Sequence, residues 1–545
     1  MDAWASRITR CLIAYLGVTL PFRPYSASRM AKDPVSEFAT PDASALSGGM
    51  HDAHVGGGGF FGHPRGLATL FFTEMWERFS YYGMRALLVL FMTAAAVGTN
   101  PGMGLDTGRA TAIYGLYTFF VYVLALPGGW IADNLWGQRK SVFVGGCIIA
   151  AGHFAMAIPN NGAFFVGLLL IVIGTGLLKP NVSTMVGDLY PEGGARRDAG
   201  FSIFYTGINL GAFLGPILCG FLAEGYNWHW GFSLAGIGMV LGLIQYKLGD
   251  KHLGEAGAYR GGADSATLAK RSKIAYGASA LFVVVMLIVG YLVATGAAPF
   301  SIETLAGSLG VVTVVLALGF FLFVIVAGGH TSVEKKRVGV IIWLFILSAL
   351  FWSGFEQAGS SLNLFAADLT DRAIGGWEVP ASWLQSVNSL FIIILAPVFG
   401  FGWTWLAARN ANPSIPVKFA LGLIGLAVGF FVLSWGAANA TPDSPVSPAW
   451  LIVTYFFHTA GELMLSPVGL SSITKLAPPS RVGQMMGMWF VSVSLGNLIA
   501  GLVAGQLETL APASLFSTVA LIVGAGGIVA LLLSPPVRKL IGDVK

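Results

Sequence analysis

The sequence predicts an all-α integral membrane protein, and three features support this fold class. Of the 545 residues, 55% are hydrophobic and only 10% are charged, whereas soluble domains average about 25% charged residues. The mean hydropathy is +0.73. The apolar runs are close to about 20 residues long and unbroken, which predicts membrane-spanning helices and not the alternating strands of a β-barrel.

The apolar runs predict fourteen transmembrane helices. Six runs come before a polar break at 249–271, two follow it, and six begin after the basic cluster at 335–337. Each run is long enough to cross the hydrocarbon core as a helix. Their approximate bounds are 67–97, 109–132, 141–159, 162–188, 197–222, 230–248, 273–295, 304–328, 337–368, 384–408, 415–437, 449–475, 483–508 and 513–536.

This pattern divides the chain into an N-terminal extension, residues 1–62, and three further parts. Residues 63–250 and 333–545 are predicted to form six-helix bundles, and 251–332 is a linker that carries two extra transmembrane helices. Two such bundles around a site near the bilayer midplane are the architecture of alternating-access carriers.

Residues 1–62 are predicted to be a disordered extension. The apolar run at 11–22 is too short to span, and a polar tail rich in Ser, Ala, Asp and Gly follows it. The run has the form of a signal peptide, but cleavage after export would place the first span on the wrong side. Whether residues 1–62 are translated stays open, because Met30 and Met50 lie downstream of Met1.

The distribution of basic residues predicts the orientation. When alternate loops are assigned to the two sides, twenty Lys and Arg residues lie on one side, and only Arg109 and Arg372 lie on the other. Positive loops remain inside, so both termini are expected in the cytoplasm, with the chain spanning a cell (inner) membrane and contacting its lipid. The net charge of +5 then reflects topology and not nucleic-acid binding.

The first predicted span carries charges where a lipid-facing helix should carry none. Glu74, Glu77, Arg78, Tyr81 and Arg85 fall within an arc of about 100° on a helix. Each charge at mid-bilayer costs about 2.5–3.5 kcal/mol, so this face must point into the protein interior or into a water-filled cavity, with partners on other helices. The alternative is a self-neutralising cluster that only holds helices together.

Three further charges lie deep in other spans, namely Lys179, Glu356 and Glu462. The bases Arg78, Arg85 and Lys179 belong to the first bundle, and the lone acids Glu356 and Glu462 belong to the second. A chamber between the bundles would then be positive on one wall and negative on the other, which suits a zwitterion. The alternatives are snorkelling for Lys179 and structural hydrogen bonds for the two acids.

No pattern in the sequence indicates an enzyme or a metal centre. The three cysteines have no metal or redox spacing. His153 and His458 are the histidines inside predicted spans and lack a second ligand at a suitable spacing. We therefore expect no metal, no catalytic residue and no cofactor.

Two sets of motifs resemble known families. The loop GGWIADNLWGQRK at 128–140 resembles the loop after the second span of the major facilitator superfamily. The chain from about 66 to 538 also resembles the bacterial proton-dependent oligopeptide transporters (the POT or PTR family). The motifs that carry this resemblance are Glu74-x-x-Glu77-Arg78-Phe79-x-Tyr81-Tyr82, Lys179-Pro180-Asn181, Phe204-Tyr205-x-x-Ile208-Asn209-x-Gly211, Phe355-Glu356-Gln357, Gln385-Ser386-Val387-Asn388 and Gly461-Glu462-Leu463.

The resemblance implies a major facilitator fold and symport of di- and tripeptides with protons. The residues implied in proton coupling are Glu74, Glu77, Arg78, Lys179 and Glu356. The residues implied in substrate binding are Arg78, Tyr81, Tyr82, Arg85, Tyr122, Lys179, Asn209, Trp352, Glu356, Asn388, Glu462, Ser466 and Trp489. Animal members carry a His in the second span where Gly115 stands here, so proton coupling would depend on carboxylates.

Three pairs are candidates for gates: Arg85 with Glu356, Lys179 with Glu462 or Glu356, and Arg109 with Asp368 at the outer mouth. The expected partners are peptides, protons and lipid, and the expected state is a monomer driven by the proton gradient. Two alternatives stay open. One is a proton-coupled carrier of the same fold for nitrate or a drug-like organic ion, and the other is a peptide-sensing receptor or channel.

Overall fold

The computed structural model describes residues 59–542 except 260, 295 and 296. The predicted disordered extension therefore lies outside the described residues, apart from its last four positions. Fourteen long helices match the fourteen predicted spans in order. Their bounds are α2 Arg65–Thr93, α3 Thr107–Val123, α5 Gln138–Met156, α6 Asn161–Asp188, α7 Gly194–Gly225, α8 Trp228–Gly249, α9 Ser265–Ala294, α10 Ile302–Ala327, α11 Ser332–Phe355, α13 Ser386–Ala408, α14 Ile415–Ala437, α15 Ala449–Leu476, α16 Val482–Ala504 and α17 Pro512–Leu532.

Eleven helical segments are long and apolar enough to cross a membrane. The other three long helices are α2, α5 and α15, and α2 carries the buried charges described above. The short elements are α4 (Ala125–Ile131), η1 (Ala132–Trp136), η2 (Asp250–His252), η3 (Glu356–Gly359), α12 (Ser361–Asp368), β1 (Ala373–Ile374), β2 (Trp377–Glu378), η4 (Ala381–Gln385), η5 (Pro479–Arg481), η6 (Gly505–Glu508) and α18 (Ser534–Ile541).

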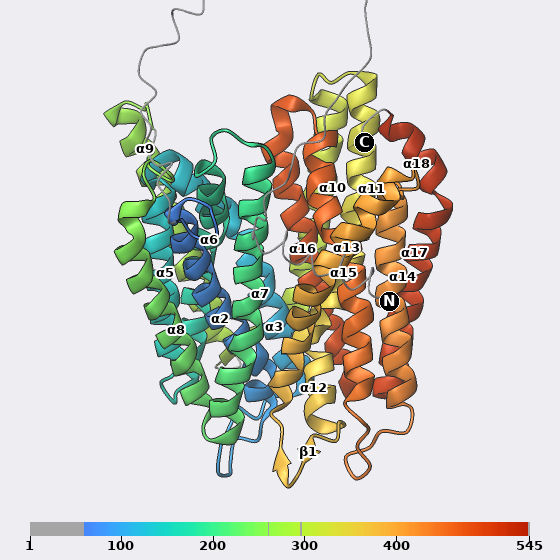
Figure 1. Ribbon diagram of the computed structural model, residues 1–545. Helices are drawn as coiled ribbons and strands as arrows, with labels where there is room; N and C mark the ends of the chain where they lie inside the picture. Colours follow the sequence, from blue (N-terminus) through green and yellow to red (C-terminus); the bar gives the residue numbers. More distant parts are fainter. Residues whose placement is uncertain (1–58, 260, 295–296, 543–545) are drawn as a thin grey trace, which may run out of the picture.

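The long helices form two halves that lie side by side (Figure 1). In the N-terminal half, α2 packs against α7 and α8, and α5 packs against α6 and α8. In the C-terminal half, α14 packs against α15 and α17, and α11 packs against α16. Two helix pairs, α3 with α16 and α7 with α13, join the halves.

The two inserted helices lie on different neighbours. Helix α9 contacts η1 and α6 of the N-terminal half, and the rings of Phe120 and Phe282 lie 5.7 Å apart. Helix α10 contacts α16, α3 and α11, so it covers one of the two seams between the halves. The side chains of Leu116, Ala306 and Leu498 form a small apolar cluster there.

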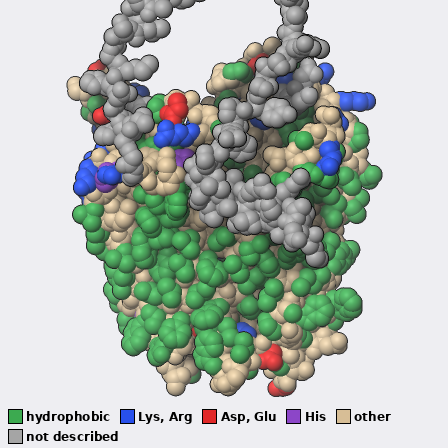
Figure 2. All heavy atoms as spheres, viewed as in Figure 1, with side chains coloured by type: hydrophobic (Ala, Val, Ile, Leu, Met, Phe, Trp, Pro, Cys, Tyr) green, Lys and Arg blue, Asp and Glu red, His purple; other side chains and the backbone are tan. Residues whose placement is uncertain are grey.

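The two ends of the bundle differ in composition. The β1–β2 strands, paired through Ala373–Glu378 and Ile374–Trp377, mark the lower end in Figure 1, which we call the hairpin end. In the face drawn in Figure 2, hydrophobic side chains cover the middle band and Lys and Arg side chains gather at the upper end. We call this upper end the basic end.

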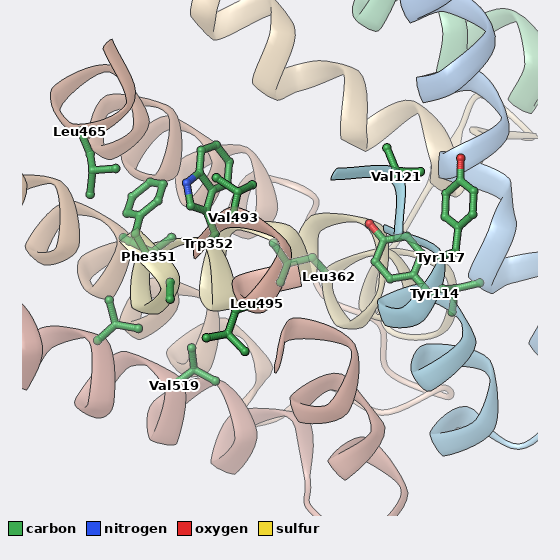
Figure 3. Close-up of a cluster of buried hydrophobic side chains, with 14 of the residues drawn as sticks. Tyr114, Tyr117, Val121, Phe351, Trp352, Leu362, Leu465, Val493, Leu495 and Val519 are labelled. Atoms are coloured by element: carbon green, nitrogen blue, oxygen red, sulfur yellow. The ribbon is translucent and has the colours of Figure 1, made fainter. Parts of the chain in front are cut away.

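The core is continuous across both halves and contains buried side chains from α2, α3, α11, α14 and α16. Figure 3 shows Tyr114 and Tyr117 on one side of this cluster and Phe351 and Trp352 on the other, with Leu362 between them. Close helix packing depends on glycine at the crossing of α3 and α16, where a Cβ on Gly501 would lie 2.7 Å from the Cα of Gly115. Interior packing is dense enough that such contacts admit no larger side chain.

Candidate functional site

The charged face of α2 is buried inside the N-terminal half. Arg78 Nε lies 2.9 Å from Glu74 Oε1 and 2.6 Å from Glu77 Oε2, and all three side chains are buried. Two carboxylates therefore share one guanidinium. Glu77 has no directed hydrogen bond to either oxygen, and Arg78 Nη2 also has no partner among the described residues.

The packing of α2 explains this placement. The backbone of α2 lies close against α7 at Arg78, where a Cβ on Gly211 would sit 3.0 Å from the Cβ of Arg78 and 2.9 Å from the amide nitrogen of Phe79. Because this contact leaves no room beside the Arg78 Cβ, the rest of the Arg78 side chain extends to the carboxylates of Glu74 and Glu77. Buried polar atoms without partners are costly, so this cluster is arranged to receive an additional proton or ligand.

Lys179 lies on α6 next to this cluster. Its Nζ is 3.7 Å from the ring centre of Tyr122, a cation–π distance, and the charges of Arg78, Glu77, Glu74 and Glu356 act on it. The predicted ion pair with Glu462 or Glu356 is not formed, because no described carboxylate oxygen lies within 4.0 Å of the Lys179 ammonium. Tyr122 occupies the position beside the ammonium instead.

The predicted pair of Arg85 and Glu356 is formed and joins the halves through Arg85 Nη2 and Glu356 Oε2. Arg85 Nε also donates to the hydroxyl of Tyr114, 2.6 Å away. Glu356 begins the 3₁₀ turn η3, which interrupts the helix between the end of α11 and the start of α12. A side chain at Gly359 would overlap the Tyr114 ring, so the glycine at this position allows η3 to pack directly against Tyr114 of α3.

A second polar group faces the site from the C-terminal half. Asn388 Nδ2 donates to Thr459 Oγ1 at 2.9 Å and to Glu462 Oε2 at 3.4 Å. Glu462 and Ser466 lie on successive turns of α15 and are half-buried. This group connects α13 with α15 and presents one carboxylate.

The aromatic candidates take different positions. Tyr81 stacks on Tyr117, with ring centres 6.4 Å apart. Trp352 is buried against Phe351 and Phe355, and its indole nitrogen has no partner among the described residues. Trp489 is buried, 6.3 Å from the Phe419 ring. The amide of Asn209 donates to the Tyr205 carbonyl of its own helix at 2.9 Å.

The bases of one half and the acids of the other converge on Tyr82. The charges of Arg78, Arg85, Glu356 and Glu462 all act on its hydroxyl. Tyr82, Tyr122, Lys179 and Glu462 are each surrounded by protein and still keep accessible surface. The two-signed arrangement predicted from the sequence is therefore present at the interface of the halves.

The predicted outer pair of Arg109 and Asp368 is not formed. Arg109 is exposed. Among the described residues its ion-pair partner is Asp106, the N-cap of its own helix, with Arg109 Nε 3.8 Å from Asp106 Oδ2. Asp368 is exposed and lines a pocket of about 870 Å³ at the hairpin end, together with Glu224, Arg372 and Trp377. Asp106 already caps the start of α3 by accepting from the Arg109 amide at 2.7 Å, so the local contact outcompetes the distant one.

Sequence reasoning missed several residues of this site. Tyr114 completes the Arg85 contact, and Thr459 holds Asn388. The signal for Tyr114 was present, because five tyrosines lie in the first two spans, at 81, 82, 114, 117 and 122. Among the described residues, no group of three His, Cys, Asp or Glu side chains is placed to hold a metal ion.

Two halves of six helices with charges of opposite sign facing each other define a secondary transporter of the major facilitator type. The POT family matches residues 139–519 of the chain, and the chain belongs to this family. It is a multi-pass membrane transporter and not an enzyme.

Comparison with individual proteins agrees with this assignment. The chain is 41% identical to the peptide transporter YePEPT of Yersinia enterocolitica, over 90% of this chain and 98% of that protein. It is 37% identical to a di-/tripeptide transporter of Lactococcus lactis subsp. cremoris, over 89% of this chain and 98% of that protein. The crystal structure of a peptide transporter POT in complex with sulfate has a TM-score of 0.81 and 42% identity, covering 89% of this chain and 97% of that one.

Proposed function

We propose that this protein is a proton-coupled symporter that imports di- and tripeptides by alternating access. Its relatives include transporters described as peptide and di-/tripeptide transporters, and a variant of one structural neighbour was solved in complex with alafosfalin. A peptide is a zwitterion, and the site presents bases from one half and acids from the other.

The observation that carries the proposal is the incomplete pairing of Glu77 and Arg78. Two carboxylates compete for one buried guanidinium, and within the described part of the chain Arg78 Nη2 and both Glu77 oxygens lack hydrogen bonds. Protonation of Glu77 neutralises one of the two carboxylates that compete for Arg78. The Arg78 guanidinium can then donate hydrogen bonds to a substrate carboxylate. Proton binding and peptide binding then favour each other, which is the requirement for symport.

The interface between the halves supplies the conformational part of the mechanism. We propose that the hairpin end is closed by the Arg85–Glu356 pair and by Asn363, whose amide donates to the Ala86 carbonyl at 2.7 Å. Opening toward that end requires both contacts to break. The carboxylate of Glu462, held by Asn388 at 3.4 Å, is placed to accept the amino terminus of the peptide.

We further propose that the hairpin end is extracellular and that both termini are cytoplasmic. The predicted topology assigns twenty Lys and Arg residues to the side of the basic end and only Arg109 and Arg372 to the side of the hairpin end. The protein would work as a monomer in the inner membrane, surrounded by lipid, with no cofactor. The driving force would be the proton gradient, and one charge moving down about 100 mV supplies about 2.3 kcal/mol, enough for about fiftyfold accumulation.

The test is uptake of a labelled dipeptide into proteoliposomes with an imposed inward proton gradient. Wild-type protein should accumulate peptide. Glu77→Gln should lose gradient-driven accumulation and keep peptide exchange without a gradient, because Gln mimics a permanently protonated acid. Glu192→Gln, which changes an exposed carboxylate between α6 and α7, is the matched control and should behave as wild type. Gradient-insensitive uptake by wild type, or gradient-driven uptake that Glu77→Gln leaves unaltered, would refute the coupling scheme.

A further inference from the structure

A second set of cross-half contacts surrounds the Arg85–Glu356 pair and has no part in the mechanism above. At the end of α7, the carboxylate of Glu224 accepts hydrogen bonds from the backbone amides of Ala381 at 2.7 Å and Ser382 at 3.0 Å. These amides begin η4, which continues into α13 as one 28-residue segment. A negative charge at a helix N-terminus is stabilised by the exposed amides and by the helix dipole.

The opposite seam contains the same contact with the halves exchanged. Glu508, in the turn that ends α16, accepts a hydrogen bond from the backbone amide of Gly108 at 2.7 Å. Gly108 is the second residue of α3. Each half therefore contributes one carboxylate that caps the first turn of a helix in the other half.

The sequence shows that these two carboxylates occupy equivalent places in the two halves. Leu210-Gly211 on α7 and Leu495-Gly496 on α16 are followed, at the same spacing, by Gly220-x-Leu222 and Gly505-x-Leu507. Glu224 comes four residues after its glycine, and Glu508 comes three residues after its own. The difference of one residue has a structural reason. Helix α7 stays α-helical to Gly225, whereas α16 ends in the 3₁₀ turn η6, which has three residues per turn instead of 3.6.

Neighbouring contacts on the α7 seam strengthen the first cap. The indole of Trp383 donates to the Ile217 carbonyl at 2.8 Å, and Ser386 Oγ donates to the Phe213 carbonyl at 2.8 Å. Pro216 lies inside α7 and has no amide hydrogen, which opens the helix backbone next to these carbonyls. Glu224 contributes a carboxylate to the contact between α7 and η4, is half-buried and lines the pocket at the hairpin end, whereas Glu508 is exposed.

We propose that Glu224 and Glu508 are a symmetry-related pair of latches that hold the extracellular gate shut and break when the transporter opens outward. This inference rests on the proposed function only in assigning the hairpin end to the outside. Glu224 is the stronger latch, because it makes two charge-assisted bonds in a half-buried position and Glu508 makes one at the surface.

The test measures opening of the extracellular gate without any substrate. A single cysteine replaces Ser389, which is buried one turn below Ser386 on α13, in a background whose three native cysteines are removed. A membrane-impermeant maleimide is added from the outside. Glu224→Gln should raise the labelling rate about tenfold, as expected for losing hydrogen bonds to a charged acceptor. Glu508→Gln should raise it about two- to fivefold.

The matched control is Glu378→Gln, which removes a carboxylate from the same pocket. Glu378 is paired with Arg372 of its own half at 2.7 Å, so labelling should equal that of the parent protein. A second reporter, Leu126→Cys on the cytoplasmic side, lies against Gly487 of the other half and should label more slowly from the cytoplasm in both latch variants. A purely structural defect would not redirect accessibility in this way.

Labelling of Glu224→Gln or of Glu508→Gln at the rate of the Glu378→Gln control would overturn the proposal. If Glu224→Gln does not fold, Glu508→Gln decides the question, because Glu508 is exposed and substitutions at exposed positions usually change stability little. The result is independent of the peptide assay. Faster labelling combined with gradient-driven uptake by Glu77→Gln would support the latches and refute proton coupling at Glu77.

Discussion

Removal of either partner of the Arg85–Glu356 pair should open the extracellular gate. Both side chains are buried, with 8% and 5% of their side-chain surface exposed. In Glu356→Gln the buried Arg85 guanidinium loses its only carboxylate partner among the described residues and faces neutral acceptors alone, the introduced amide oxygen and the Tyr114 hydroxyl at 2.6 Å. Breaking a buried pair by removing one partner costs about 3–5 kcal/mol, so the ratio of closed to open protein should fall by about two to four orders of magnitude.

A double-mutant cycle separates the pair from the effects of each residue alone. Glu356→Gln, Arg85→Gln and the double variant are compared by extracellular labelling of the Ser389→Cys reporter. The two single variants should each increase labelling strongly. The double variant should open little further, because it leaves no unpaired buried charge, and the coupling free energy should exceed about 2 kcal/mol.

The reasoning is refuted if the effects of the two single variants add. Additivity would mean that Arg85 and Glu356 act independently on the gate, and their contact in the closed state would then contribute no stability. Glu378→Gln again serves as the control, because it alters charge in the pocket at the hairpin end without breaking a hydrogen bond or ion pair between the halves.

Three further predictions test other parts of the structure. Glu462→Gln should weaken binding of free dipeptides about tenfold and leave the weak binding of N-acetylated dipeptides unchanged, as measured by calorimetry; equal losses for both would contradict its role at the amino terminus. Gly501→Ala places a Cβ 2.7 Å from the Cα of Gly115, so it should lower the free energy of unfolding by about 1–3 kcal/mol, measured by thermal melting against Gly483→Ala, which has open space around it. Burial and the charge of Arg196 lower the pKa of His63 below its usual 6.5, so stability that is present above pH 6.5 is lost as the pH falls below that value. The melting temperature of wild type should therefore fall more steeply than that of His63→Gln between pH 7.5 and 5, and parallel curves would contradict this.

The predicted spans agree with the structure because hydropathy acts locally. Each of the fourteen long helices overlaps its predicted run, since a backbone in lipid must satisfy its own hydrogen bonds within the helix. The ninth predicted run, 337–368, is not one helix, because α11 ends at Phe355 and η3 and α12 follow it. The buried face of α2 was also predictable, because a helix fixes which residues share a face.

The partners of the charges were predicted less well. Arg85 and Glu356 meet as expected, but Lys179 lies over Tyr122 and Arg109 contacts Asp106. The pattern of charges in the sequence indicates which buried residues need a partner of opposite charge. For Lys179 and for Arg109, several candidate partners were available. Which of them is reached depends on side-chain length and on the conformation in which the two halves are held.

The sequence by itself determined the number of spans, their order and the need to bury the charges of α2, and the basic loops predict the orientation. All of these follow from the high cost of placing polar groups in hydrocarbon, which each segment experiences separately. The tertiary structure alone decided which seams join the halves and where the caps of Glu224 and Glu508 fall. These contacts bring together residues more than a hundred positions apart, and backbone amides leave no mark in the sequence that would show which carboxylate they bind.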